Sequence, residues 1–208
     1  MTKIKKPNRT FIFIARIFIF FIFKFILYYR MHIKNKHNLP DKGPFIIVSN
    51  HTSFLDSVLI GYVSPIPLYY IGKEELFRNK LFSFIIRQCG AVPVSRTKNG
   101  GGSGLIKIIN IIKSGGAILF FPEGTRSIDN KLLPAKSGTG FIIYHSGAPV
   151  VPVFIKGLHG LREKETLFSG PKTVSMIIGK PVLFNKDSYD RISSRVMEEI
   201  KNLGFILD

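Results

Sequence analysis

His51 and Asp56 are the pair of residues whose types and spacing best suit acid–base chemistry. A neutral imidazole can take the proton of an alcohol while the alcohol attacks a carbonyl, because histidine titrates near neutral pH. A carboxylate on the other ring nitrogen fixes the tautomer and stabilises the imidazolium. On a continuous helix a spacing of five places the side chains about 140° apart, so they can meet only if His51 lies at or before the helix start. Taken alone, such a pair is more often a helix cap with a solvent-facing histidine.

Three cations could supply a phosphate site near this pair. Lys73, Arg96 and Arg126 each follow a different apolar run, and the planar guanidinium of arginine suits bidentate binding of phosphate. If the apolar runs are parallel strands, their carboxyl ends meet at one edge of a sheet, which would also carry His51. One such cation would be uninformative, but three in the same pattern predict a phosphate site.

The heptapeptide 121–127, Phe-Pro-Glu-Gly-Thr-Arg-Ser, contains the third of these cations. Proline and glycine fix a turn that can approach a ligand closely, and Glu123 with Arg126 at the end of a buried strand is badly placed for solubility alone. A surface turn with an ion pair is the alternative. The glycine-rich stretch 99–104 lacks the Gly-Lys-Ser/Thr ending of a nucleotide-binding loop, so we interpret it as a flexible connection.

The elements that must position these residues alternate along the chain. Apolar runs predict strands at 45–49, 68–71, 91–94, 117–121, 149–155 and 174–178, and helical spacing predicts helices at 53–62, 79–88, 104–113, 139–145 and 188–202. This alternation predicts an α/β fold with a mainly parallel sheet flanked by helices. The turn-rich stretch 38–44 marks a boundary. It separates a basic hydrophobic membrane-associated helical segment, 1–37, from a domain at 38–208.

Residues 11–29 form the most apolar stretch and predict a helix long enough to cross a bilayer. On that helix Arg9, Arg16, Lys24 and Arg30 fall within an arc of about 120°. A basic stripe on an apolar cylinder is typical of a helix that lies in the headgroup layer, so we favour an in-plane or re-entrant helix over a simple span. A signal peptide is less suitable because no small-residue cleavage site follows.

The net charge of +17 indicates an anionic partner, either nucleic acid or a membrane surface. Ten of the 30 basic residues but only one of the 13 acidic residues lie within 1–44. The excess therefore surrounds the apolar segment, which favours lipid. Most aromatic residues lie in the apolar runs, which argues against nucleic acid. Cys89 is the only cysteine, which excludes an intramolecular disulfide and a cysteine-based zinc site and suits the cytoplasm.

Taken in order, the motifs resemble those of the glycerolipid acyltransferase family, which includes the 1-acylglycerol-3-phosphate (lysophosphatidic acid) acyltransferases. The resemblance covers about residues 40–185 and rests on four matches: Asn50-His51 with Asp56, Gly90 to Arg96, the heptapeptide 121–127, and Val151-Pro152-Val153. The heptapeptide matches without change. Together with the order of the motifs, it is the most specific part of the resemblance.

The resemblance implies that His51 activates the acceptor hydroxyl and that Asp56 orients His51. It also implies a glycerol-phosphate pocket formed by Lys73, Arg96, Glu123, Gly124, Thr125 and Arg126. The donor would be acyl-CoA or acyl carrier protein, whose thioester is already activated, so no metal or bound cofactor is expected. The implied reaction acylates the sn-2 hydroxyl of lysophosphatidic acid to phosphatidic acid in phospholipid biosynthesis. It would take place on the cytoplasmic face of the cell inner membrane or cytoplasmic membrane.

Other functions stay open at this point. The acceptor could be glycerol-3-phosphate, another lysophospholipid or a lipid A precursor. A serine esterase would lack its nucleophile, because the sequence has no Gly-x-Ser-x-Gly motif. A non-catalytic basic membrane-binding protein would explain the apolar helix and the charge, but not His51, Asp56 and Glu123.

Overall fold

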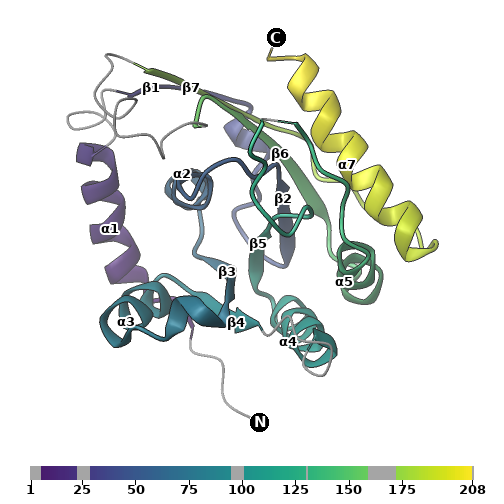
Figure 1. Ribbon diagram of the computed structural model, residues 1–208, viewed down its shortest axis with the longest axis horizontal. Helices are drawn as coiled ribbons and strands as arrows, with labels where there is room; N and C mark the ends of the chain where they lie inside the picture. Colours follow the sequence, from purple (N-terminus) through teal and green to yellow (C-terminus); the bar gives the residue numbers. More distant parts are fainter. Residues whose placement is uncertain (1–5, 23–28, 95–100, 130, 159–171, 208) are drawn as a thin grey trace.

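In the part of the chain that the structure describes, seven strands form one sheet, and their spatial order in it is β1-β7-β6-β2-β5-β3-β4 (Figure 1). The computed structural model describes residues 6–22, 29–94, 101–129, 131–158 and 172–207. The strands are β1 (Tyr29–Lys34), β2 (Phe45–Ser49), β3 (Leu68–Lys73), β4 (Ala91–Val94), β5 (Ala117–Phe120), β6 (Val150–Lys156) and β7 (Lys172–Ile178). Among these strands only β6 and β7 pair antiparallel, and the other pairings are parallel.

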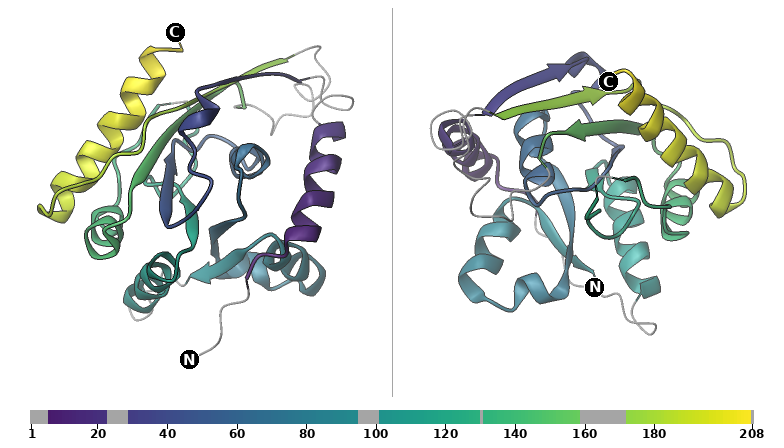
Figure 2. Two further views of the ribbon diagram at one scale, coloured as in Figure 1. Left: turned by 180° about the vertical axis from the view of Figure 1, so that it is seen from behind. Right: turned by 45° about the horizontal axis from the view of Figure 1, so that its top comes forward.

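Helices cover both faces of the sheet (Figure 2). They are α1 (Arg9–Phe21), α2 (Leu55–Val63), α3 (Lys80–Gln88), α4 (Gly101–Lys113), α5 (Gly138–Ser146) and α7 (Tyr189–Phe205), with 3-10 turns η2 (Lys36–Asn38) and η3 (Glu74–Phe77). The side chains of β2 alternate between two cores. Phe45 and Ile47 pack with Leu59 of α2, whereas Ile46 and Val48 pack in the core that α4, α5 and α7 cover. All of β2 is buried, as expected for a parallel strand covered on both faces.

The prediction of an α/β fold with a mainly parallel sheet flanked by helices is confirmed. Every strand and helix predicted after residue 44 is present, with small shifts at its ends. The apolar runs were informative because central parallel strands are buried on both faces and therefore read as unbroken hydrophobic stretches.

The structure corrects the prediction for the residues before β2. Residues 29–34 form β1, which pairs parallel with β7, although the predicted helix extended to residue 29 and the membrane segment to residue 37. Met31 and Ile33 pack on the core while Arg30 and His32 are exposed. This alternation is typical of a strand, but beside the long apolar run it is too short to stand out. Residues 29–34 therefore belong to the sheet, and the division of the chain near residue 37 stays a prediction.

Helix α1 also differs from the expected basic stripe. It has 13 residues and ends at Phe21, and none of the helices in the described ranges has the length and apolar character needed to cross a membrane. The guanidinium of Arg16 donates a hydrogen bond of 2.6 Å to the carbonyl oxygen of Ser64, at the C-terminal end of α2, where a cation is favourable. Lys24 lies outside the described residues and Arg30 lies in β1. A helical projection alone cannot distinguish a side chain that faces water from one that faces a neighbouring helix.

Candidate active site

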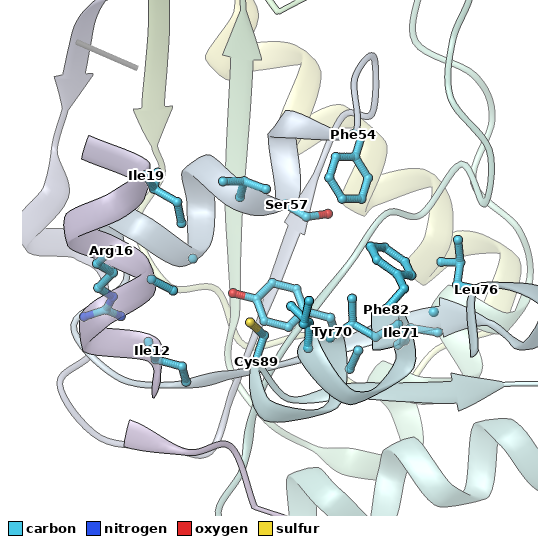
Figure 3. Close-up of a pocket in the computed structure, with 17 residues that line it drawn as sticks. Ile12, Arg16, Ile19, Phe54, Ser57, Tyr70, Ile71, Leu76, Phe82 and Cys89 are labelled. Carbon is cyan, nitrogen blue, oxygen red and sulfur yellow. The ribbon is translucent and has the colours of Figure 1, made fainter. Parts of the chain in front are cut away.

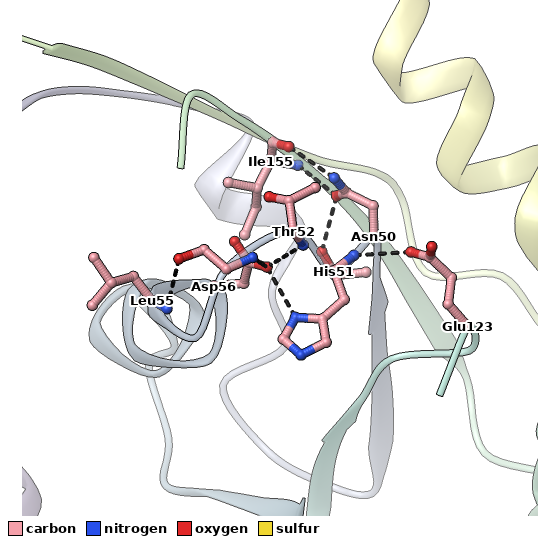
Figure 4. A network of polar contacts seen from close by, with 9 residues as sticks. Asn50, His51, Thr52, Leu55, Asp56, Glu123 and Ile155 are labelled. Carbon is pink, nitrogen blue, oxygen red and sulfur yellow. Dashed lines mark hydrogen bonds and ion pairs between the residues drawn. The ribbon is translucent and has the colours of Figure 1, made fainter. Parts of the chain in front are cut away.

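The carboxyl end of β2 leads directly into the candidate base. Asn50 follows the strand, and its side-chain amide exchanges two hydrogen bonds of 2.8 Å with the main chain of Ile155 in β6. These bonds continue the pairing of β2 with β6 after β2 itself has ended. The chain therefore leaves the sheet at a fixed point, and His51 is the first residue beyond it (Figure 4).

The imidazole of His51 lies against the carboxylate of Asp56 (Figure 4). Nδ1 of His51 is 3.0 Å from Oδ2 of Asp56, which is fully buried in the first turn of α2. Oδ2 also accepts hydrogen bonds from the main-chain N–H of Thr52, at 2.7 Å, and of Ser53, at 2.8 Å. His51 thus lies before the helix and the chain turns between the two residues, which is the geometry that their spacing requires.

The contacts of Oδ2 indicate which nitrogen of His51 carries the proton. Oδ2 already accepts hydrogen bonds from two main-chain N–H groups, so it is not itself the donor in its third contact. The proton between Oδ2 and His51 therefore lies on Nδ1. With Nδ1 protonated, Nε2 has the lone pair that a base needs. Nε2 has no hydrogen-bond partner among the described residues, and 17% of the His51 side chain is exposed. A substrate hydroxyl can therefore reach Nε2.

The loop after β5, residues 121–127, contacts His51 on its other side. The ring of Phe121 stacks on the imidazole, with the centroids 3.8 Å apart and the planes 12° from parallel. The main-chain N–H of His51 donates to Oε1 of Glu123 at 2.9 Å, and the main-chain oxygen of His51 accepts from the N–H of Ser127 at 2.8 Å. The heptapeptide singled out in the sequence is thus bound directly to the candidate base.

Glu123 is almost completely buried, with 1% of its surface exposed. Its second oxygen, Oε2, accepts a hydrogen bond of 2.9 Å from the main-chain N–H of Leu133. Burial raises the pKa of Glu123 above its ordinary value, although the hydrogen bonds from Leu133 and His51 act in the opposite direction. Glu123 was predicted to belong to the phosphate pocket, whereas in the structure its carboxylate is directed at main-chain N–H groups. A direct contact between Glu123 and a substrate stays a prediction.

Of the other predicted phosphate-binding residues, Lys73, Thr125 and Arg126 are exposed near the same edge, and Gly124 is half-buried. Lys73 is the last residue of β3, and Thr125 and Arg126 lie in the loop after β5. The strands β2, β5 and β3 are neighbours and parallel, so their carboxyl ends share one edge. Gly124 has φ of +71°, a conformation that favours glycine. Arg96 lies outside the described residues. Within the described ranges, no group of three or more His, Cys, Asp or Glu side chains could hold a metal ion.

An apolar cavity of about 340 Å³ lies between α1, α2 and α3 (Figure 3). Another face of the helix that carries Asp56 contributes to its wall, through Phe54, Ser57, Val58 and Gly61. Burial raises the pKa of the Tyr70 hydroxyl, which points into this region. The sequence did not predict the cavity, because its walls come from helices far apart in the chain. The only signal was the helical spacing of apolar residues on α1 (Ile12, Ala15, Ile19) and α3 (Phe82, Ile86, Cys89).

The chain is similar to known acyltransferases in sequence and in fold. The family model described as Acyltransferase matches residues 30–156. The 1-acyl-sn-glycerol-3-phosphate acyltransferase of Bacillus subtilis (strain 168) is 32% identical over 195 residues, which cover 89% of this chain and 94% of that protein. A chloroplastic 1-acyl-sn-glycerol-3-phosphate acyltransferase of Brassica napus is 33% identical over 132 residues, which cover 62% of this chain but only 38% of that protein. The crystal structure of the 1-acyl-sn-glycerophosphate acyltransferase of Thermotoga maritima matches with a TM-score of 0.73 and 27% identity, covering 92% of this chain and 77% of that one.

Proposed function

The chain belongs to the acyltransferase family, and we propose that it transfers an acyl chain from a thioester donor to the sn-2 hydroxyl of 1-acyl-sn-glycerol-3-phosphate, which gives phosphatidic acid. The observation that carries this proposal is the 3.0 Å contact between Nδ1 of His51 and Oδ2 of Asp56. It leaves Nε2 open at the edge of the sheet near which Arg126 is exposed. The names of the relatives from Bacillus subtilis and Thermotoga maritima support this choice of acceptor.

In the proposed reaction Nε2 of His51 takes the proton of the acceptor hydroxyl, and the oxygen attacks the carbonyl carbon of the thioester. A C–O bond forms, and the tetrahedral intermediate then collapses as the C–S bond breaks. The departing thiolate takes the proton back from the imidazolium, so His51 ends in its starting state. Asp56 stabilises the imidazolium while it exists, as carboxylates do in hydrolase triads.

The exposed cations near the same edge support the choice of a phosphorylated acceptor. The guanidinium of Arg126 would bind the phosphate by charge-assisted hydrogen bonds, with Lys73 adding positive charge. Gly124, Thr125 and Arg96 complete the proposed phosphate pocket. The acyl donor is acyl-CoA or the thioester of acyl carrier protein, since either presents the same activated carbonyl, and the reaction needs no metal or bound cofactor.

The cavity between α1, α2 and α3 supports an acyl substrate. Its lining is almost entirely apolar, and it shares α2 with the His51–Asp56 pair. Each methylene that moves from water into such a cavity contributes about 0.8 kcal/mol. We therefore assign the fatty chain of one of the two substrates to this cavity.

We further propose that α1 and α3 seat the protein on an anionic membrane, on its cytoplasmic face. Both helices line the cavity on one side and expose apolar side chains on another: Phe13, Ile14, Ile17, Phe18 and Phe21 on α1, and Leu81 and Phe84 on α3. Basic residues are concentrated in the first 44 residues of the chain, and each basic residue near an anionic leaflet contributes about 1 kcal/mol. A catalyst seated in this way meets a lipid acceptor and a cytosolic donor together.

The double variant Leu81→Glu/Phe84→Glu is expected to bind vesicles of phosphatidylglycerol and phosphatidylcholine at least about 10²-fold more weakly than the parent, since each apolar side chain contributes about 1.5–3 kcal/mol. Co-sedimentation at several vesicle concentrations measures this change. Leu183→Glu/Phe205→Glu is the matched control, because these apolar side chains are similarly exposed. Leu183 belongs to the segment between β7 and α7, and Phe205 is the last residue of α7, which lies across the molecule from α1 (Figure 1). Equal binding by the two double variants would contradict the proposed contact between α3 and the membrane.

The Arg126→Ala variant tests the acceptor. We expect the KM for 1-acyl-sn-glycerol-3-phosphate to rise about 10- to 100-fold, because hydrogen bonds to charged groups contribute about 1.5–3 kcal/mol. The donor KM should change less than about twofold. Initial rates on a panel of acceptors, with acyl-CoA and acyl carrier protein thioesters as donors, provide both constants. Arg191→Ala is the control, because this exposed arginine pairs with Asp187 near the start of α7.

The acceptor panel separates the proposal from its closest alternatives. It contains 1-acyl-sn-glycerol-3-phosphate, glycerol-3-phosphate, a lysophospholipid with a larger headgroup, and 1-acylglycerol without phosphate. The proposed function requires the first of these to have the highest kcat/KM. Preference for glycerol-3-phosphate or for another lysophospholipid would replace the acceptor, and absence of transfer with every acceptor and donor would overturn the function.

A further inference from the structure

The loop 121–127 contacts His51 at three separate points, which we call the His51 clamp. Glu123 accepts from the main-chain N–H, Ser127 donates to the main-chain oxygen, and Phe121 stacks on the ring. Asp56 adds a fourth contact at Nδ1. Together these contacts fix both the backbone of His51 and the plane of its ring, and they leave Nε2 as the free position.

Within the clamp, Glu123 is poorly suited to bind a phosphate. Its carboxylate is buried, and each oxygen already accepts a main-chain N–H, from His51 on one side and from Leu133 on the other. A carboxylate also repels an anion of the same sign. The exposed members of the same heptapeptide, Thr125 and Arg126, are the ones that can reach a ligand.

We propose that Glu123 is a positioning residue for His51 and not a ligand of the acceptor. The heptapeptide then has two separate tasks: its buried glutamate fixes the base, and its exposed arginine binds the phosphate. This inference rests on the proposed role of His51 as the general base.

Glu123 acts through the backbone because His51 lies in the short turn between β2 and α2. Oε1 of Glu123 accepts from the N–H of His51 (Figure 4), and Oε2 accepts from the N–H of Leu133. One carboxylate therefore connects this turn to the chain that follows the heptapeptide. Hydrogen bonds to an ionised acceptor are about twice as strong as neutral ones. A displacement of the base of about 1 Å costs about 10²-fold in rate. A loss at Glu123 should therefore appear in kcat.

The variant Glu123→Gln tests the proposal. An amide keeps one acceptor oxygen but presents an NH₂ group to the second N–H donor, so one of the two bonds is lost. We expect kcat to fall about 10- to 100-fold while the acceptor KM stays within about twofold, the opposite of the split expected for Arg126→Ala. Glu198→Gln is the control, because it makes the same chemical change in an exposed glutamate of α7. A raised acceptor KM with unchanged kcat, or no change at all, would overturn the proposal.

A double variant separates an effect through His51 from a direct effect on substrate. If Glu123 acts only by positioning the imidazole, adding Glu123→Gln to His51→Ala should leave the residual rate within about twofold, because residues that act as a unit are not additive. If Glu123 binds the acceptor, Glu123→Gln should lower the residual kcat/KM of His51→Ala by about the same factor by which it lowers kcat/KM in the parent enzyme. The acceptor used is whichever member of the panel the parent enzyme acylates best, so a wrong choice of acceptor does not affect this result.

A spectroscopic measurement without substrate completes the test. The proton on Nδ1 of His51, hydrogen-bonded to Asp56, should give a low-field ¹H NMR signal that is identified by its loss in His51→Ala. Glu123→Gln is expected to shift or broaden this signal, and Glu198→Gln to leave it unchanged. An unaltered signal in a folded Glu123→Gln protein would overturn the positioning role even if transfer to 1-acyl-sn-glycerol-3-phosphate had been demonstrated.

Discussion

Replacement of His51 by alanine is expected to lower kcat for acyl transfer by about 10²–10⁴-fold, the usual contribution of a general base, while the protein stays folded and keeps the vesicle binding proposed above. The fold should survive because alanine keeps the main-chain bonds to Glu123 and Ser127. The folded state loses the ring stack on Phe121, which contributes about 0.5–1.5 kcal/mol beyond area burial. It also loses the hydrogen bond from Nδ1 to Asp56, whose Oδ2 keeps its two main-chain donors. Steady-state rates at saturating acceptor and donor measure the change in kcat, and thermal unfolding and vesicle binding check the rest.

The matched control for this variant is His145→Ala. His145 is also a partly exposed histidine with a polar partner, since its Nε2 lies 3.0 Å from the hydroxyl of Tyr189, but it lies on α5 in the layer that covers the other face of the sheet. Its loss should leave kcat within about twofold. Turnover near the normal rate in a folded His51→Ala protein would show that His51 is not the general base, and it would overturn the proposed function.

The meeting of His51 with Asp56 could be predicted from the sequence because the spacing left one workable geometry. Five residues on a helix separate the side chains, so contact required His51 to precede the helix. The chain turns before the helix because the carboxylate of Asp56 accepts hydrogen bonds from the main-chain N–H groups of Thr52 and Ser53. Carboxylates commonly accept such bonds at the start of a helix. The same oxygen that organises the helix start therefore also orients the imidazole. Local chemistry alone determines this part of the site.

The role of Glu123 could not be predicted in the same way. A glutamate before glycine and arginine reads equally well as a ligand or as an internal acceptor, because residue type does not say which way the carboxylate turns. Its direction depends on the N–H of Leu133, which follows in sequence, and on the N–H of His51, which is brought close by the pairing of β2 with β5. The second donor, the N–H of His51, reaches Glu123 only because of the register between β2 and β5.

The N-terminal residues also have contacts that could not be predicted from the sequence, and here the partners are even more distant in the chain. The apolar pattern of α1 was evident, but the pattern did not show that Arg16 would reach Ser64 on α2 or that Ile12 and Ile19 would line a cavity. It also obscured β1, whose pairing partner β7 begins more than a hundred residues later. Contacts between elements that are distant in the chain decide these features, and the amphipathic period of a single element carries no information about them.

The variant Asp56→Asn is expected to lower kcat by about 10²–10⁴-fold and, unlike His51→Ala, to destabilise the fold as well. The amide oxygen can take the place of Oδ2 and keep the contacts with Nδ1 of His51 and with the N–H groups of Thr52 and Ser53. It carries no charge, however, so it does not stabilise the imidazolium. The amide NH₂ would occupy the place of Oδ1, which has no hydrogen-bond partner among the described residues. A buried donor without a partner costs about 1–3 kcal/mol.

These two effects can be separated by measurement. Urea unfolding should show a free energy of unfolding lower by about 1–3 kcal/mol for Asp56→Asn, and a larger loss for Asp56→Ala, which leaves two main-chain N–H groups without their acceptor. If Asp56 acts through His51, the double variant His51→Ala/Asp56→Asn should be no slower than His51→Ala alone, although it should be less stable. A further fall in rate in the double variant would mean that Asp56 contributes to transfer by a route other than the imidazole. Normal kcat in a folded Asp56→Asn protein would show that the carboxylate serves only the start of α2.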